Sequence, residues 1–157
     1  MPDLSVKAVY SRERMVEQVL VEGGTVDFYG STLDLPPKGL RQYSPLMLPL
    51  MTGIVAGLYA SHRREGTRLE APSLRISKKA YATAHYHPGK HEIMLPLEKW
   101  AFSELTLLHE VAHAVVGGGH RDQRSAHGKA WRIAYASLMR DAVSPAASLI
   151  LMDALDA

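Results

Sequence analysis

Hydrophobic residues recur with a helical period most clearly between residues 103 and 117. Apolar side chains and two histidines share one stripe of a helix there: Leu105, Leu108, His109, Ala112, His113 and Val116. Ser103 is a candidate N-cap, Glu104 suits a first turn, and the glycines at 117–119 supply a stop. Only Glu104 and Glu110 are charged, so the pattern predicts a buried helix.

Periodicity, turn residues and capping residues predict the other elements more coarsely. They are helices over residues 11–21, 45–60, 127–140 and from 144 onward, and strands over residues 25–33, 80–87 and 91–97. Pro88-Gly89-Lys90 joins the last two strands as a tight hairpin turn, and Pro36-Pro37 forms a linker. An α+β fold is expected, mainly helical, with a small β-sheet beside the helix at 103–117.

Composition indicates one ordinary folded domain over residues 1–157. Lys and Arg number 18 against 16 Asp and Glu, so the net charge gives little sign of nucleic-acid binding. Two basic clusters are interpreted as solvated faces, with DNA association as the weaker alternative: Arg63, Arg64, Arg68, Arg75, Lys78 and Lys79, then Arg121, Arg124, Lys129 and Arg132. The absence of Cys excludes disulfides and Cys-ligated zinc.

The apolar stretch from Pro45 to Ala60 is the one segment to weigh as a membrane span. It is shorter than the roughly 20 residues that a spanning helix needs, and Pro and Gly interrupt it. We interpret it as a core helix capped by Ser44, with Ile54 and Leu58 on its buried side. The first residues lack a basic region followed by an apolar one, so no membrane association and a cytoplasmic location are expected.

Residues 109–113 read His-Glu-Val-Ala-His, a pattern typical of zinc hydrolases. On a helix, His109 and His113 lie one turn apart on the same face and can bind one zinc ion, with Glu110 beside them. The alternative is a buried helix whose histidines hydrogen-bond to neighbouring backbone.

Catalytic zinc usually has three protein ligands, so a third is expected downstream. The metzincin spacing would need a histidine at the position of Gly119, and His120 is one residue late. A glutamate on a later helix is excluded because no Glu follows Glu110. His127 remains, in the first turn of a helix that Ser125 is expected to cap.

The chain resembles the SprT-like zincin metallopeptidases, including the Spartan proteases. The likeness covers about residues 74–140 and is carried by the His-Glu-x-x-His helix, by His127-Gly128-Lys129-Ala130-Trp131, and by the preceding hairpin. The whole chain also looks like small metallohydrolases with this motif in actinobacteria and their phages. The resemblance implies a single zincin-like domain with Zn²⁺ held by His109, His113 and His127.

The expected function is therefore a zinc-dependent metallopeptidase acting on a peptide or protein substrate. Glu110 would be the general base towards a metal-activated water. A zinc hydrolase of a non-peptide amide, or a noncatalytic zincin-like binding protein, is the alternative. Tyr135, Tyr86, His120 and Arg121 are all candidates for a second oxyanion donor, and the sequence does not choose among them.

The hairpin suggests how a substrate is held. An edge strand beside the zinc helix can pair with an extended peptide by β-augmentation, and we expect Glu92–Pro96 to be that strand. His85, His87 and His91 are interpreted as a polar face or substrate contact in preference to a second metal site, and His120 as a loop residue. Trp131 and residues 133–138 are expected to dock the helix that carries His127.

Overall fold

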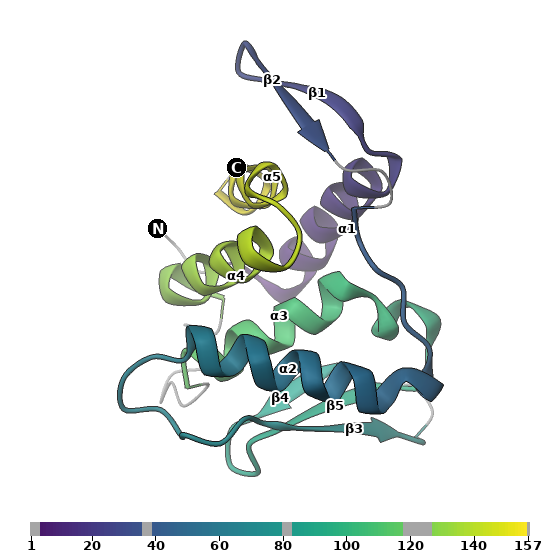
Figure 1. Cartoon of the computed structure of the whole chain (residues 1–157), viewed down its shortest axis with the longest axis vertical. Helices are drawn as coiled ribbons and strands as arrows, with labels where there is room; N and C mark the ends of the chain where they lie inside the picture. The colour runs from purple at the N-terminus through teal and green to yellow at the C-terminus, as the bar shows by residue number, and fades with distance from the viewer. Residues whose placement is uncertain (1–3, 36–38, 80–82, 118–126, 157) are drawn as a thin grey trace.

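Helix α3 (Glu104–Val115) lies in the middle of the molecule, in contact with helices on one side and with a helix and a sheet on the other (Figure 1). The computed structural model describes residues 4–35, 39–79, 83–117 and 127–156. Ser103 caps α3 as predicted, because its hydroxyl accepts a hydrogen bond from the Thr106 amide at 3.2 Å. Gly117, at φ 92°, follows the last turn. Ten of the twelve helix residues are buried, which confirms the predicted buried helix.

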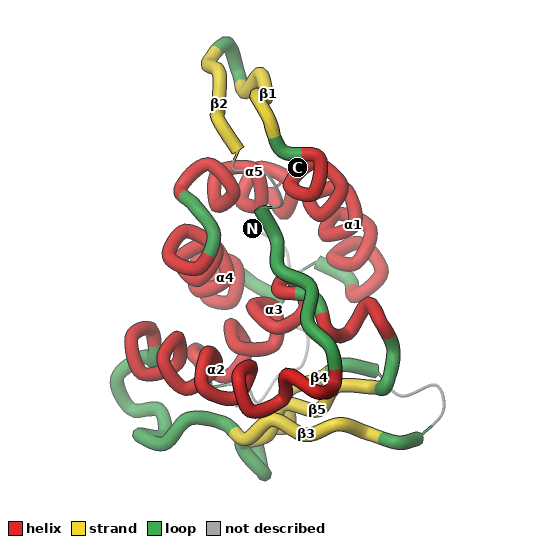
Figure 2. Tube along the Cα trace, turned by 45° about the vertical axis from the view of Figure 1, so that its right-hand side comes forward, coloured by secondary structure: helices red, strands yellow, loops and turns green. Residues whose placement is uncertain are grey.

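Three helices lie together on one side of α3. They are α1 (Val6–Glu22), α4 (Lys129–Ala142) and α5 (Pro145–Asp156), where α5 contacts both of the others and α4 contacts α3 (Figures 1 and 2). The predicted start of α5 is confirmed: Pro145 opens it and the Ser144 hydroxyl accepts from the Ala147 amide at 3.1 Å. Helix α1 begins earlier than predicted, after its N-cap Ser5.

A three-stranded sheet and α2 (Leu48–His62) lie on the other side of α3 (Figure 1). The strand order is β3 (Ser73–Ser77), β5 (Glu92–Pro96), β4 (His85–His87), with β3 parallel and β4 antiparallel to β5. The hairpin of β4 and β5 was predicted and β3 was not. The prediction that Glu92–Pro96 is an edge strand is wrong, since strands pair with both of its sides. The outer strand next to α3 is β4.

Residues 25–33 do not form the single strand predicted for them. They form most of a hairpin, β1 (Gly24–Phe28) and β2 (Ser31–Leu35), which projects from the helices (Figures 1 and 2). The turn residues Tyr29 and Gly30 both have positive φ, 50° and 82°, as a two-residue hairpin turn of the primed type requires. Residues on both sides of this turn favour extended structure, so the sequence pattern predicts one continuous strand.

The apolar segment at 45–60 is helical, but it starts differently from the prediction. A 3₁₀ turn, η1 (Pro45–Met47), precedes α2, and Ser44 makes no side-chain capping bond. Met51, Val55 and Tyr59 form the buried stripe of α2. In the part of the chain that the structure describes, no helix combines the length and apolar character needed to cross a membrane. The predicted Pro36-Pro37 linker lies outside the described residues.

One hydrophobic cluster joins the two sides of the molecule. It draws buried side chains from all five α-helices and from the three-stranded sheet, including Val9, Val55, Ile93, Leu108, Leu138 and Leu151. This common core holds α3 fixed between α1 and α4 on one side and β4 on the other.

Candidate metal centre

Three histidine side chains converge at the contact between α3 and the start of α4. Their candidate ligand atoms, in His109, His113 and His127, all lie within 4.8 Å of one another. His109 Nε2 and His113 Nε2 are 3.3 Å apart, as expected for residues one helical turn apart on α3. The structure therefore brings together the three residues predicted from the sequence as zinc ligands.

His127 reaches this position from the segment before α4, and not from its first turn as predicted. The N-cap of α4 is Gly128, and the predicted cap Ser125 lies outside the described residues. Arg132 holds the segment, because its Nε donates to the His127 carbonyl at 3.1 Å. The side chain of Arg132 is also buried, so the interpretation of this member of the second basic cluster as solvated is wrong.

Trp131 docks α4 against α3. Its indole nitrogen donates to the His109 carbonyl at 3.2 Å, and its ring lies 4.8, 5.3 and 4.6 Å, between centroids, from those of His109, His113 and His127. Trp131 is fully buried, so the predicted packing role is confirmed; Ile133, 48% exposed, does not share it. One side chain therefore packs against all three candidate ligands.

Two buried polar atoms at the centre lack a hydrogen-bond partner among the described residues. They are His127 Nε2 and Glu110 Oε2. Such atoms are rare in folded proteins, because burial without a partner costs free energy. Burial, together with the nearby His109, lowers the pKa of His127 to about 4, so the imidazole is neutral near pH 7. A neutral imidazole with an unpaired nitrogen is what a metal ion needs from a ligand.

Glu110 lies beside the three histidines but is not a member of the group that could hold a metal ion. Its Oε1 is 3.6 Å from His109 Nε2. Burial is the main cause that raises the pKa of Glu110, and Glu13 adds to it, while His109 and a backbone hydrogen bond from Tyr86 oppose it. A carboxylate near three nitrogen ligands is suited to accept a proton from a molecule bound between them.

Glu13 of α1 is a site residue that sequence reasoning missed. Its two carboxylate oxygens lie 3.0 and 2.9 Å from His109 Nδ1, and the Tyr135 hydroxyl donates to Oε2 at 2.5 Å. Because a carboxylate accepts, Nδ1 carries the proton and His109 Nε2 is left to face the other histidines. Burial lowers the pKa of His109, but the charge and hydrogen bond of Glu13 outweigh it and the pKa is raised.

A signal for Glu13 was present in the sequence. The buried residues of α1 are Val9, Glu13, Val16 and Leu20, so a single carboxylate interrupts an apolar stripe. A buried charge in such a stripe requires a partner. The partner is 96 positions further along the chain, and periodicity within α1 gives no means of finding it.

The other candidate residues have separate partners. The Tyr135 hydroxyl donates to Glu13, and the Tyr86 hydroxyl lies 2.7 Å from His91 Nδ1, so neither is free to act as the oxyanion donor considered from the sequence. His120 and Arg121 lie outside the described residues.

His85, His87 and His91 do not gather into a second metal site in the structure. His91 is buried, and its Nε2 lies 2.6 Å from the Glu70 carbonyl. His87 accepts a hydrogen bond from the Lys90 amide at 3.1 Å, and exposed His85 lies 3.1 Å from the Thr83 carbonyl. Within the described ranges, the group of three metal-ligating residues is that of His109, His113 and His127.

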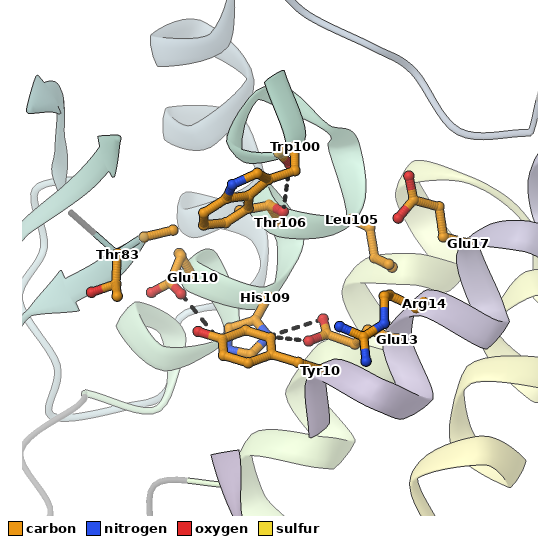
Figure 3. Close-up of a pocket in the computed structure, with 11 residues that line it drawn as sticks. Tyr10, Glu13, Arg14, Glu17, Thr83, Trp100, Leu105, Thr106, His109 and Glu110 are labelled. Atoms are coloured by element: carbon orange, nitrogen blue, oxygen red, sulfur yellow. Dashed lines mark hydrogen bonds and ion pairs between the residues drawn. The ribbon is translucent and has the colours of Figure 1, made fainter. Parts of the chain in front are cut away.

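A cavity of about 470 Å³ opens next to Glu110 and His109. Figure 3 shows Trp100 and Tyr10 on opposite sides of it, with Glu110 and His109 between them. Trp100 belongs to the 3₁₀ turn η2 (Lys99–Phe102), and Tyr10 belongs to α1. The volume is in the range of cavities that bind small molecules or peptide side chains.

Comparison of the chain with protein-family models, with curated proteins and with solved structures finds no match. The resemblance to SprT-like zincins therefore stays a prediction, carried by the motif residues.

Proposed function

We propose that this protein is a zinc-dependent hydrolase with a zincin-like fold, and specifically a metallopeptidase. The observation that carries the proposal is the convergence of His109, His113 and His127 beside the carboxylate of Glu110. Three histidine ligands and a nearby carboxylate that is not needed as a ligand are typical of catalytic zinc, whereas structural zinc usually has four protein ligands.

The donor set fits Zn²⁺. Imidazole nitrogens are favourable zinc ligands. The buried Nε2 of His127, which has no hydrogen-bond partner in the described part of the chain, would gain one from the ion. Zinc, when bound, supplies a Lewis acid that activates water and polarises a carbonyl group. His109, His113 and His127 would hold it, and Glu13 would keep His109 in the required tautomer.

Glu110 is the residue to which we assign proton transfer. Its carboxylate lies next to the candidate ligands, and one of its oxygens, Oε2, has no hydrogen-bond partner among the described residues. We infer that it accepts a proton from the attacking water and delivers one to the departing amine, as a general base and then a general acid. Its low exposure keeps competing water away from this transfer.

A peptide is favoured over a small amide as substrate because β4 is an outer strand in contact with α3. An outer strand can pair with an extended chain through backbone groups that face away from the sheet, although in β4 the Tyr86 amide already donates to Glu110. We assign this pairing to β4 in place of β5, whose two sides are already paired.

Metal analysis and one conservative variant test the proposal. Wild-type protein, purified without a His tag, should carry about one zinc per chain, and His109→Ala and His127→Ala should lose it. His87→Ala, which changes an exposed histidine of β4, is the control and should retain zinc. A wild type that takes up no zinc on reconstitution would refute the metal site.

Glu110→Gln keeps the shape of the side chain and removes the base. It should bind zinc like the wild type and lose peptide hydrolysis by about 100-fold or more. Activity is measured by mass spectrometry on a mixture of blocked peptides. Undiminished hydrolysis by Glu110→Gln would remove this residue from the mechanism.

A further inference from the structure

We infer that the cavity between α1 and the first half of α3 recognises a large apolar side chain, aromatic above all, of a peptide substrate. The inference rests on the proposed function and adds the class of substrate residue that the site selects. Because Glu110 and His109 line the cavity, its occupant would lie directly beside the bond to be cleaved.

The walls of the cavity are largely apolar. Trp100, Tyr10, Leu105 and Ala84 line it, and two of these are large aromatic rings that water still reaches: Trp100 is 49% and Tyr10 37% exposed. Figure 3 shows these two rings on opposite sides of the space. Exposed tryptophan and tyrosine at the mouth of a cavity gain the most from covering by an apolar group.

Neighbouring contacts hold the backbone of Trp100 and the ring of Tyr10 in position. The Trp100 carbonyl accepts a hydrogen bond from the Thr106 hydroxyl at 3.1 Å, which ties η2 to the first turn of α3. The Tyr10 ring stacks on that of His109, with centroids 6.1 Å apart and planes inclined by 19°. A preformed slot loses little conformational entropy when a side chain enters it.

Several polar side chains along the cavity are already committed to the protein. Both oxygens of Glu13 contact His109, and Thr106 donates to the Trp100 carbonyl. Arg14 and Glu17 also line it, three positions apart on α1, and they carry opposite charges. The cavity therefore favours an uncharged occupant over a basic or an acidic side chain.

Blocked pentapeptides Ac-Ala-Ala-X-Ala-Ala-NH₂, with X as Phe, Leu, Ala, Asp or Lys, test this inference. Zinc-loaded wild type should cleave the Phe and Leu peptides next to X about 10- to 100-fold faster, in kcat/KM, than the Ala peptide. Trp100→Ala should abolish most of that preference, measured as the ratio of kcat/KM for the Phe peptide to kcat/KM for the Ala peptide. Leu97→Ala is the matched control, because Leu97 is a similarly exposed apolar residue, at 58%, outside the cavity lining.

A binding measurement separates this inference from the proposed reaction. In Glu110→Gln, titration with the Phe peptide should shift the tryptophan emission saturably, and the added variant Trp100→Phe should remove the shift, since the other tryptophan, Trp131, is fully buried. No saturable shift, equal cleavage of the Phe and Ala peptides, or a preference for Asp or Lys would each overturn the pocket assignment. Binding of the Phe peptide without cleavage of any peptide by the wild type would refute the proposed reaction and support the apolar pocket.

Discussion

At the scale of single residues, the geometry of the candidate metal centre depends most on the contact between Glu13 and His109. The Glu13 carboxylate accepts a hydrogen bond from His109 Nδ1, so the other ring nitrogen of His109, Nε2, faces His113 and His127. Carboxylate partners of this kind orient a histidine ligand and raise its basicity. Glu13 is accordingly a positioning residue, since it acts on the site through His109.

Glu13→Gln should lower zinc affinity by roughly 10- to 100-fold. The amide is a weaker acceptor for His109 Nδ1 and carries no negative charge to favour a bound cation. Competition with a chromophoric chelator at neutral pH measures the change. Glu17→Gln, one turn further along α1 and lining the same cavity, is the control and should change zinc affinity little. Equal affinities for the two variants would contradict the positioning role.

Tyr135 should contribute to stability through its hydrogen bond to Glu13. In Tyr135→Phe the buried carboxylate loses a donor, and we expect a loss of about 1.5–3 kcal/mol in the free energy of unfolding, the range for hydrogen bonds to charged groups. Urea denaturation measures it.

Tyr29→Phe supplies a matched control for this measurement. The Tyr29 hydroxyl also donates to a carboxylate at 2.5 Å, that of Asp153, but its ring is 81% exposed. Water replaces the lost bond there, so the change in stability should be far smaller. If both variants lost the same stability, burial would not be the reason for the effect at Tyr135.

At the scale of elements, hydrogen bonds tie the first turn of α3 to η2. The Ser103 hydroxyl accepts from the Thr106 amide and donates to the Thr106 hydroxyl, which in turn donates to the Trp100 carbonyl. This chain of bonds joins the N-terminus of the helix to one wall of the cavity.

Ser103→Ala should destabilise the protein by about 1–2 kcal/mol, the upper part of the range for loss of an N-cap. Ser103 is buried, so water cannot easily reach the unpaired amide. Ser5→Ala removes the corresponding cap of α1, where the bond is exposed, and should cost less. Thermal unfolding of both variants tests the difference, and a larger loss in Ser5→Ala would contradict the central place of α3.

At the scale of the whole molecule, a bound metal ion would connect three helices. Two ligands come from α3 and one precedes α4, while Glu13 adds α1 through His109. A ligand that binds only the folded state stabilises it by about 2.7 kcal/mol when its concentration is 100 times its Kd. Zinc binding should therefore act on global stability and not only on the local site.

Removal of zinc by EDTA should lower the Tm of the wild type, and adding zinc in excess of the chelator should restore it. His127→Ala should show a Tm that does not respond to zinc or EDTA, because the third ligand is missing. Scanning calorimetry measures both. A zinc-dependent rise in Tm that persists in His127→Ala would point to binding elsewhere.

The sequence by itself determined the features that depend on local geometry. The 3.6-residue period placed His109 and His113 on one face, Ser103 and the glycines bounded α3, and exclusion of the alternatives left His127. The helix and its two histidines repeat within a few residues, so a single segment contains that information. His127 followed from the absence of another suitable ligand downstream.

Only the tertiary structure decided the features that join distant segments. Glu13 contacts His109 across 96 positions of sequence. β3 pairs with β5, so the outer strand next to α3 is β4. Tyr10 and Trp100, from α1 and η2, line one cavity beside Glu110. The physical reason is that packing of helices and strands sets these contacts, and the periodicity of one segment does not specify which distant surface will bury it.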